Sequence, residues 1–181
     1  MRRITAELFS TLDGVVDAPE KWHIPFHTDA MAALTEETLA ASDTMLLGRA
    51  TYLEHAGYWP DESGRLADLM NGIHKIVYTT TLTDLAWNNS TPAAGDIAAR
   101  VRELKDGPGG GIAVTGSVSV VRALLRAGLL DELRLIIDPV VAGTGERLFE
   151  EGLDHATFGL VESRAFDTGA LSVTYSTAPR P

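Results

Sequence analysis

Hydrophobic residues along the chain alternate between two spacings, one typical of buried strands and one typical of amphipathic helices. Short apolar runs bounded by glycine or polar residues predict strands over 2–12, 44–47, 74–80, 112–115 and 132–137. Helical spacing of Ala, Leu, Met or Val predicts helices over 28–41, directly after Gly48, and over 61–71, 96–105 and 117–127. Two last segments, 157–166 and 170–176, are separated by Asp167-Thr168-Gly169 and predict an antiparallel hairpin.

The ends of these segments carry residues that start and stop helices. Thr28 and Asp96 stand where an N-cap belongs, and Gly128 stands where a C-cap glycine belongs. Strands that alternate with helices predict an α/β fold, with a mainly parallel central sheet flanked by helices and an antiparallel C-terminal hairpin. Neither a linker nor a repeat interrupts the pattern, so residues 1–181 are expected to form a single domain.

Charge and composition remove several classes of function. The formal net charge is −10, so neither nucleic acid nor an anionic membrane surface is an expected partner. The absence of cysteine excludes disulfides, thiolate catalysis and cysteine-bound zinc. No apolar stretch approaches the ~20 residues of a membrane span. No apolar region follows Arg2 and Arg3 as it would in a signal peptide, so a cytoplasmic location is expected.

One strand-to-helix turn has the composition of a phosphate site. The apolar run 44–47 ends at Gly48, and Arg49 and Thr51 fall in the first turn of the next helix. The first amides of a helix are unpaired and lie at the positive end of its dipole, so they attract phosphate. Arg49 adds a permanent forked cation and Thr51 adds a hydroxyl. A capped helix with a surface arginine explains the same residues without a ligand.

A second turn of this kind follows the strand over 112–115. Gly116 lets a phosphate approach the backbone, and Ser117, Val118 and Ser119 open the next helix. Neither a Walker loop nor a G-x-G-x-x-G fingerprint is present, so a plain strand-to-helix turn is the alternative. Parallel strands end at one edge of a sheet, where ligands bind, and the two turns together therefore predict a nucleotide site.

Other polar positions are weaker candidates. The hydroxyls of Thr79 and Thr80, at the end of the strand over 74–80, could reach a ribose, although β-propensity explains them equally well. The two glycines within 139–149 suit a loop against a ligand or a structural turn. None of the histidines has the spacing of a metal site, so no metal is predicted. The acid–base candidates are Asp13, His27, Asp29, Glu36 and Glu37.

Seven short motifs, taken in order, resemble those of one family. They are Ser10-Thr11-Leu12-Asp13-Gly14, Gly48-Arg49-x-Thr51-Tyr52, Tyr58-Trp59-Pro60, Lys75 to Leu82, Gly116-Ser117, Leu129 to Leu135, and Pro139 to Gly145. The chain resembles the reductase domain of riboflavin biosynthesis, the C-terminal half of a bifunctional deaminase-reductase, and most of all its small stand-alone members. That resemblance covers nearly the whole chain and implies a dihydrofolate-reductase-like fold.

The resemblance implies NADPH as cofactor and hydride transfer to a small conjugated heterocycle of the dihydrofolate or pterin kind. It implies that Arg49 faces the 2′-phosphate and that the helix start at Gly48 and Thr51 meets the pyrophosphate. The remaining implied contacts are Gly116, Ser117, Val118 and Ser119 with the pyrophosphate from the other side, Thr79 and Thr80 with the adenosine, and Leu8, Phe9 and Val16 with the nicotinamide.

The substrate end departs from the pattern of dihydrofolate reductases. In those enzymes, a carboxylate that closely follows a Trp-x-x-Pro segment grips the pterin ring. Here the segment 22–25 has that form, but His27 stands where the acid would fall and Asp29 is two residues on. His27 and Asp29 are therefore the two candidate proton donors.

Three alternatives stay open at this point. The chain could reduce a ribosylated pyrimidine, as in riboflavin synthesis, or it could bind NADP as a non-catalytic module. It could also be a structural α/β domain with no nucleotide site. The resemblance further favours a homodimer that pairs through an edge of the sheet.

Overall fold

The computed structural model describes residues 1–149 and 155–177. Its strands are β1 (Ile4–Thr11), β2 (Ser42–Gly48), β3 (His74–Tyr78), β4 (Ser90–Ala93), β5 (Gly111–Thr115), β6 (Glu132–Asp138), β7 (Gly159–Ala165) and β8 (Leu171–Ser176). Its α-helices are α1 (Asp29–Ala40), α2 (Arg49–Ala56), α3 (Arg65–Gly72), α4 (Ile97–Asp106) and α5 (Val118–Arg126). Short 3-10 turns are η1 (Pro19–Lys21), η2 (Ile24–Phe26) and η3 (Trp59–Asp61).

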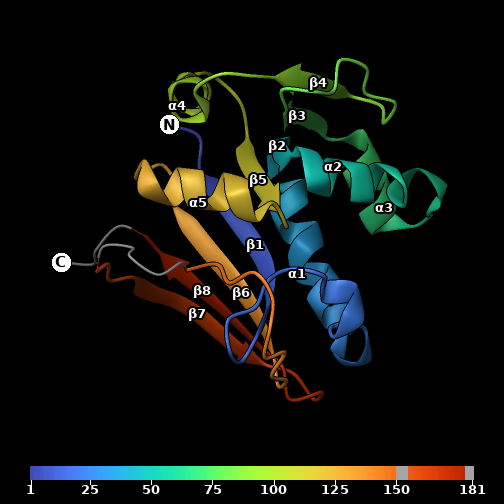
Figure 1. Cartoon of the computed structure of the whole chain (residues 1–181), viewed down its shortest axis with the longest axis vertical. Coiled ribbons are helices and arrows are strands. Elements are labelled where there is room, and N and C mark those ends of the chain that lie inside the picture. The colour runs from blue at the N-terminus through green and yellow to red at the C-terminus, as the bar shows by residue number, and fades with distance from the viewer. Residues whose placement is uncertain (150–154, 178–181) are drawn as a thin grey trace.

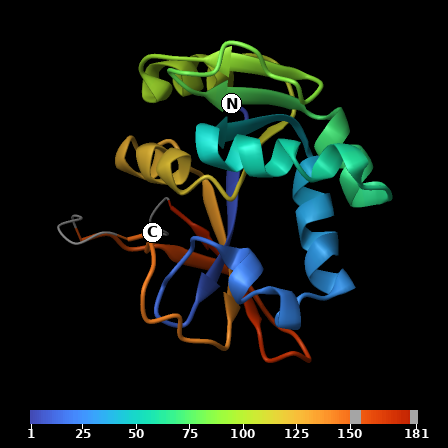
Figure 2. The same cartoon turned by 45° about the vertical axis from the view of Figure 1, so that its right-hand side comes forward.

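All eight strands form one sheet in the order β4-β3-β2-β5-β1-β6-β8-β7. Every neighbouring pair from β4 to β6 is parallel, whereas β8 and β7 are antiparallel. Figures 1 and 2 show α1 and α5 on opposite sides of the central strands. The predicted α/β fold, mainly parallel with an antiparallel C-terminal hairpin, is confirmed.

The predicted helix caps form as their residue types suggest. Thr28 Oγ1 accepts the Met31 amide at 3.3 Å, and Asp96 Oδ1 accepts the Ala98 amide at 2.8 Å. Gly128 follows the end of α5 with a φ of 63°, a conformation that side chains disfavour. Each cap satisfies backbone groups that a helix end otherwise leaves unpaired.

The hydrophobic pattern of the sequence does not predict strand β4. The segment of β4 is only four residues long and contains Pro92, which lies opposite Val77 of β3. Proline has no amide hydrogen for a sheet ladder, so it is tolerated in an edge strand, and β4 is the outermost strand on this side. The pairing with β3, rather than local propensity, makes this segment a strand.

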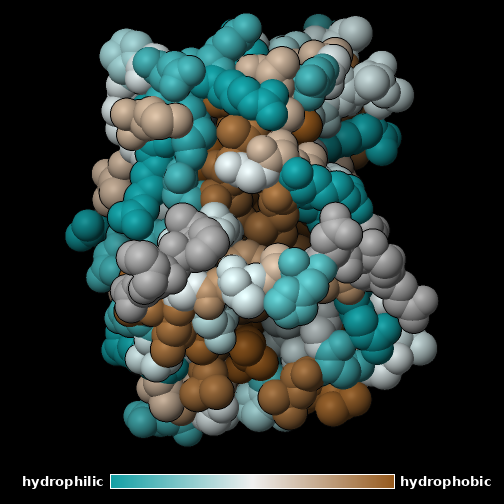
Figure 3. Space-filling view, turned by 90° about the vertical axis from the view of Figure 1, so that its left-hand side faces the viewer, coloured by the Kyte–Doolittle hydropathy of each residue, from teal (hydrophilic) through white to brown (hydrophobic). Residues whose placement is uncertain are grey.

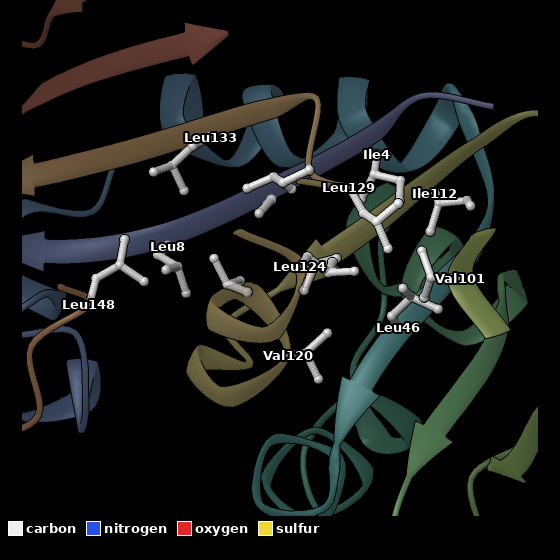
Figure 4. Packing of buried hydrophobic residues seen from close by; sticks show 14 of the residues in the cluster. Ile4, Leu8, Leu46, Val101, Ile112, Val120, Leu124, Leu129, Leu133 and Leu148 are labelled. Carbon is white, nitrogen blue, oxygen red and sulfur yellow. The ribbon is translucent and has the colours of Figure 1, made fainter. Parts of the chain in front are cut away.

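The central strands are buried on both faces, which explains their continuous apolar runs. Leu46 of β2 packs with α4 and α5 on one face, while its neighbours Met45 and Leu47 pack with α2 and α3 on the other. Figure 4 shows the first of these clusters, in which Leu124 of α5 lies between its helix and the strand that carries Ile112. The two clusters hold the strand ends at fixed positions.

A buried ion pair fixes α1 against the sheet. Arg134 Nη1 of β6 lies 3.0 Å from Glu7 Oε2 of β1, and their side chains are 12% and 5% exposed. The same nitrogen donates to the Leu34 carbonyl and to Thr38 Oγ1 of α1, each at 3.0 Å. Thr35 Oγ1 donates to the other oxygen of Glu7. This network ties the middle and second half of α1 to β1 and β6.

Breaking this pair from one side should destabilise the protein strongly. Glu7→Gln leaves a buried guanidinium without its counter-ion, and we expect unfolding free energy to fall by about 3–5 kcal/mol in urea denaturation followed by tryptophan fluorescence. The double variant Glu7→Leu/Arg134→Met, which removes both charges, should be more stable than Glu7→Gln. A loss below about 1 kcal/mol in Glu7→Gln would instead mark the pair as a solvated surface contact.

Candidate functional site

Two strand-to-helix turns meet at the carboxyl edge of the sheet. β2 runs into α2 through Gly48, and its neighbour β5 runs into α5 through Gly116 and Ser117. The Gly48 amide donates to Ser117 Oγ at 2.9 Å, and the Ser117 side chain is buried. That hydroxyl accepts from the residue that precedes α2 and does not cap its own helix, so the first amides of α5 have no side-chain cap among the described residues.

Glycine allows the two turns to approach each other. A Cβ on Gly48 would lie 3.2 Å from Ser119 Oγ, closer than most such contacts. Gly116 has a φ of 78° and faces the Thr51 methyl group, 3.5 Å from where its Cβ would be. A side chain at either position would fill the space between the two helix starts. The structure thus brings Gly48, Thr51, Gly116, Ser117 and Ser119 together.

Arg49 is the first residue of α2 and is exposed. Its guanidinium makes no ion pair or side-chain hydrogen bond within residues 1–149 and 155–177. Most other arginines near the core are already paired, as Arg2 is with Asp43 and Arg134 is with Glu7. Arg49 is therefore a cation available to an external anion, at the positive end of a helix dipole.

Thr79 and Thr80 lie just past the end of β3. Thr79 Oγ1 accepts the amides of Thr81 at 3.2 Å and Leu82 at 3.1 Å, so this hydroxyl shapes the turn and keeps only its hydrogen for a ligand. Thr80 is exposed. The local turn that the sequence allowed is therefore present at Thr79.

The three residues assigned to the nicotinamide end divide into two environments. Leu8 and Val16 are 2% and 5% exposed and belong to the core cluster beneath α5, so only their backbone or the edge of a side chain can meet a ligand. Phe9 faces the other side of the sheet, is half-buried, and stacks on His23 with ring centroids 3.7 Å apart.

A cluster of imidazoles and a carboxylate lies beside Phe9. His23 Nδ1 is 2.7 Å from Asp138 Oδ2, and His27 Nδ1 is 3.4 Å from His23 Nε2. His23 and Asp138 are buried, whereas His27 and Asp29 are exposed. The sequence pointed to His27 and Asp29 and missed His23 and Asp138. The signal in the sequence for Asp138 was a carboxylate that directly follows the apolar run 135–137.

Burial and neighbouring charges both shift the pKa values of this cluster. Burial, and then the neighbouring His23, lower the pKa of His27 below 6.5, while Asp29 and Asp138 act to raise it. Burial raises the pKa of Asp138 above 3.8, and the hydrogen bond from His23 opposes that rise. In the described part of the chain, no three His, Asp or Glu side chains converge as a metal site would require.

Comparison with known proteins decides the family. The chain matches the RibD C-terminal domain family over residues 2–172. The chain belongs to this family. A curated relative, the uncharacterized protein YyaP of Bacillus subtilis strain 168, is 30% identical over 96% of this chain and 94% of its own. The resemblance found in the motifs is thereby confirmed.

Solved structures show that this RibD C-terminal domain has the expected fold. A putative riboflavin biosynthesis protein from Shewanella sp. PV-4 superposes with a TM-score of 0.76 at 16% identity, over 98% of this chain and 99% of the other. Dihydrofolate reductase from Enterococcus faecalis superposes with a TM-score of 0.65 at 19% identity, over 96% and 95%. The dihydrofolate-reductase-like fold is confirmed. No helix in the described part of the chain is long and apolar enough to span a membrane.

Two of the family motifs form one structural unit beside the site. Asp13 accepts from the Thr11 hydroxyl at 2.6 Å and from the amides of Ala142 and Gly143 at 3.0 and 2.9 Å. Those bonds, the Thr11 bond most, lower the pKa of Asp13 from 3.8 to about 2. The loop after β6 is thus tied to the turn after β1, which favours the structural interpretation of its glycines.

Protonation of Asp13 should release that loop. Because its pKa is lower in the folded state, its contribution to stability is present above pH 4 and is lost as pH falls toward 2. In ¹³C NMR, we expect the Asp13 carboxyl carbon to titrate near pH 2. Asp13→Asn should speed hydrogen exchange of the Ala142 and Gly143 amides several-fold at neutral pH. The exposed Asp106→Asn is the control, and equal exchange in both variants would contradict the assignment.

Proposed function

We propose that the chain is a single-domain reductase that uses NADPH to transfer a hydride to a small conjugated heterocycle. The observation that carries the proposal is the contact between Gly48 and Ser117, which joins two helix starts into one surface. Such a surface offers unpaired amides to a pyrophosphate from two sides. The donors are the amides of Val118 and Ser119 on α5 and the start of α2 with Thr51.

Arg49 supports the choice of NADPH over NADH. The two nucleotides differ by a 2′-phosphate, and Arg49 is exposed beside the proposed pyrophosphate site, with no partner for its guanidinium in the part of the chain that the structure describes. Guanidinium and phosphate form strong bidentate hydrogen bonds. The net charge of −10 makes such a local cation necessary, since the overall field repels the cofactor. Thr79 and Thr80 would border the adenosine on the β3 side of Arg49.

The order of strands indicates how the proposed cofactor would lie along the carboxyl edge of the sheet, from its phosphates to its nicotinamide. Along the carboxyl edge, β2, β5, β1 and β6 follow one another, three strand spacings of about 4.8 Å, or roughly 14 Å in all. With its phosphates at β2 and β5, the dinucleotide would extend its nicotinamide toward Phe9 of β1, with Leu8 and Val16 beneath. The substrate would then lie near His27 and Asp29, the two candidate proton donors.

The comparisons support the same assignment. The reductase from Enterococcus faecalis that shares this fold is described as a complex with NADP(H). The bound nucleotide supplies the hydride, and the protein orients it and provides the proton. Structures at such low identity show the fold alone, so the groups at positions 48–51 and 116–119 carry the argument for the cofactor.

Arg49→Gln should weaken NADPH far more than NADH. The lost charge-assisted contact is worth on the order of 1–3 kcal/mol, which corresponds to roughly 5- to 150-fold in Kd for NADPH. Tryptophan fluorescence during titration with each nucleotide measures both constants. Arg102→Gln, which removes an exposed arginine of α4, is the matched control and should change neither.

Two results would contradict the proposal at different points. Equal wild-type affinity for NADPH and NADH would remove the 2′-phosphate assignment to Arg49. Tight NADPH binding with no NADPH oxidation by dihydrofolate, a pterin, a flavin or a ribosylated pyrimidine would favour the non-catalytic module. The relative rates at which the members of this panel are reduced distinguish a pterin-like substrate from a ribosylated pyrimidine.

We also propose that the protein forms a homodimer through β7. β7 is the outermost strand on its side of the sheet, and its residues from Leu160 to Ala165 are exposed. Figure 3 shows hydrophobic residues at several places in the lower part of the face that it draws. The exposed apolar side chains of β7 and β8 include Leu160, Val161 and Leu171. An unpaired edge with apolar side chains is a pairing surface.

The assembly has its own test. In light scattering coupled to size exclusion, we expect a dimer mass for the wild type and a monomer mass for Leu160→Asp/Leu171→Asp, because two buried charges would oppose the contact. Glu162→Gln is the control on the same strand, since it removes a charge and should leave the dimer intact. A monomeric wild type at micromolar concentration would rule the assembly out.

A further inference from the structure

Three titratable side chains form a line from the core to the surface at the carboxyl ends of β1 and β6. Asp138, the last residue of β6, is 0% exposed. Its Oδ2 contacts His23 Nδ1 at 2.7 Å, and its Oδ1 has no hydrogen-bond partner in the described part of the chain. His23 in turn contacts His27, whose ring is exposed. A buried carboxylate with one free oxygen is costly, so its retention calls for an explanation.

With Asp138 ionised and His23 neutral, the contacts assign the hydrogens to particular ring nitrogens. A carboxylate oxygen only accepts, so His23 Nδ1 donates to Asp138. His23 Nε2 then has a lone pair, which accepts from His27 Nδ1. The second nitrogen of His27, Nε2, has no partner among the described residues. When His27 is protonated, its Nε2 also carries a hydrogen. Among the ring N–H groups of His23 and His27, only this one has no acceptor among the described residues, so it can donate its proton to another molecule.

Packing holds the middle of the line in place. The His23 ring stacks on Phe9 at 3.7 Å between centroids and meets the His27 ring edge-on at 5.5 Å. Asp29, the other candidate donor, is exposed at the start of α1 and has no side-chain hydrogen bond or ion pair in the described residues. Two anchored contacts therefore orient His27, whereas nothing comparable orients the carboxylate of Asp29.

We propose that His27 is the proton donor of the reductase and that His23 and Asp138 are positioning residues that hold its Nε2 toward the substrate. This inference rests on the proposed function. A hydride from the reduced nicotinamide would form a C–H bond as the C=N or C=O π bond breaks. The proton on His27 Nε2 would form the N–H or O–H bond. The nicotinamide is left oxidised, and His27 is left neutral and regains its proton from solvent.

The charged groups around His27 set the pH range of this step. They are His23 from the segment before α1, Asp29 from α1 and Asp138 from β6. Proton donation requires protonated His27, so turnover should fall as pH rises through its pKa, which lies below 6.5. Asp138→Asn removes an anion that raises this pKa, so the fall should move to lower pH.

The first experiment compares four variants by NADPH oxidation with the best acceptor of the panel. His27→Gln should lower kcat on the order of 100-fold, the usual contribution of a general acid, with the Kd for NADPH changed less than about threefold. Asp138→Asn and His23→Phe should lower kcat at least about tenfold. Asp138→Asn should also shift the pH profile downward. His74→Gln, at the amino end of β3, is the control and should match the wild type.

A second measurement does not depend on turnover. In ¹⁵N NMR at pH 8, wild-type His27 should be protonated at Nδ1. In Asp138→Asn, the amide can donate to His23 Nδ1, which reverses the hydrogens along the line and moves that of His27 to Nε2. In His23→Phe, the acceptor is lost and the Nε2–H form should appear.

The outcomes separate the two proposals. An unchanged His27 tautomer in both variants, or a kcat–pH profile of Asp138→Asn identical to the wild type, would overturn the positioning role. If wild-type protein binds NADPH and reduces no acceptor, the reductase function fails, while the tautomer of His27 still decides whether His23 and Asp138 orient it. Loss of folding in Asp138→Asn alone, with a normal tautomer in folded His23→Phe, would assign the cluster to stability and also overturn the proposal.

Discussion

The strands from β4 to β6, taken in their order across the sheet, pair in parallel. This pairing determines which residues can meet at one site. Each of these strands ends at the same edge of the sheet, and a helix or loop leaves from that edge. Residues that are far apart in the chain therefore become neighbours there, as Gly48 and Ser117 do across 69 positions. A shift of one residue in the pairing of β2 with β5 would turn every side chain of the shifted strand to the other face and separate the two helix starts.

The two ends of the edge are built differently. At β2 and β5, the groups that face solvent are backbone amides, small hydroxyls and one arginine, which suit a ligand with phosphates. At β1 and β6, Asp138 of β6 contacts His23, and His23 contacts the exposed His27, so the protonation of each group affects its neighbour. The first arrangement can bind an anion without changing its own charge, whereas the second can gain or lose a proton.

Local sequence was sufficient for the elements whose signals are local. The strand over 112–115, the caps Thr28 and Asp96 and the helix after Gly116 follow from periodicity and residue type, and the order of the short motifs was enough to recognise the family. The strand β4 was missed because Pro92 contradicts strand propensity and only its pairing with β3 overrides it. Asp138 with His23 and Glu7 with Arg134 were missed because their partners lie 115 and 127 residues away, and only the strand order brings them together.

The two borders of the sheet are not equivalent. On one side, β4 is short and Pro92 interrupts its hydrogen-bonding groups, so a further strand finds little to attach to. On the other side, β7 is seven residues long and contains no proline, and its pairing with β8 shifts register between Leu160 and Glu162. In the homodimer proposed above, two copies would pair through β7 about a two-fold axis, and both β7 edges would then be occupied. Such a pair would close on itself, and the continuous sheet would then not extend beyond two copies.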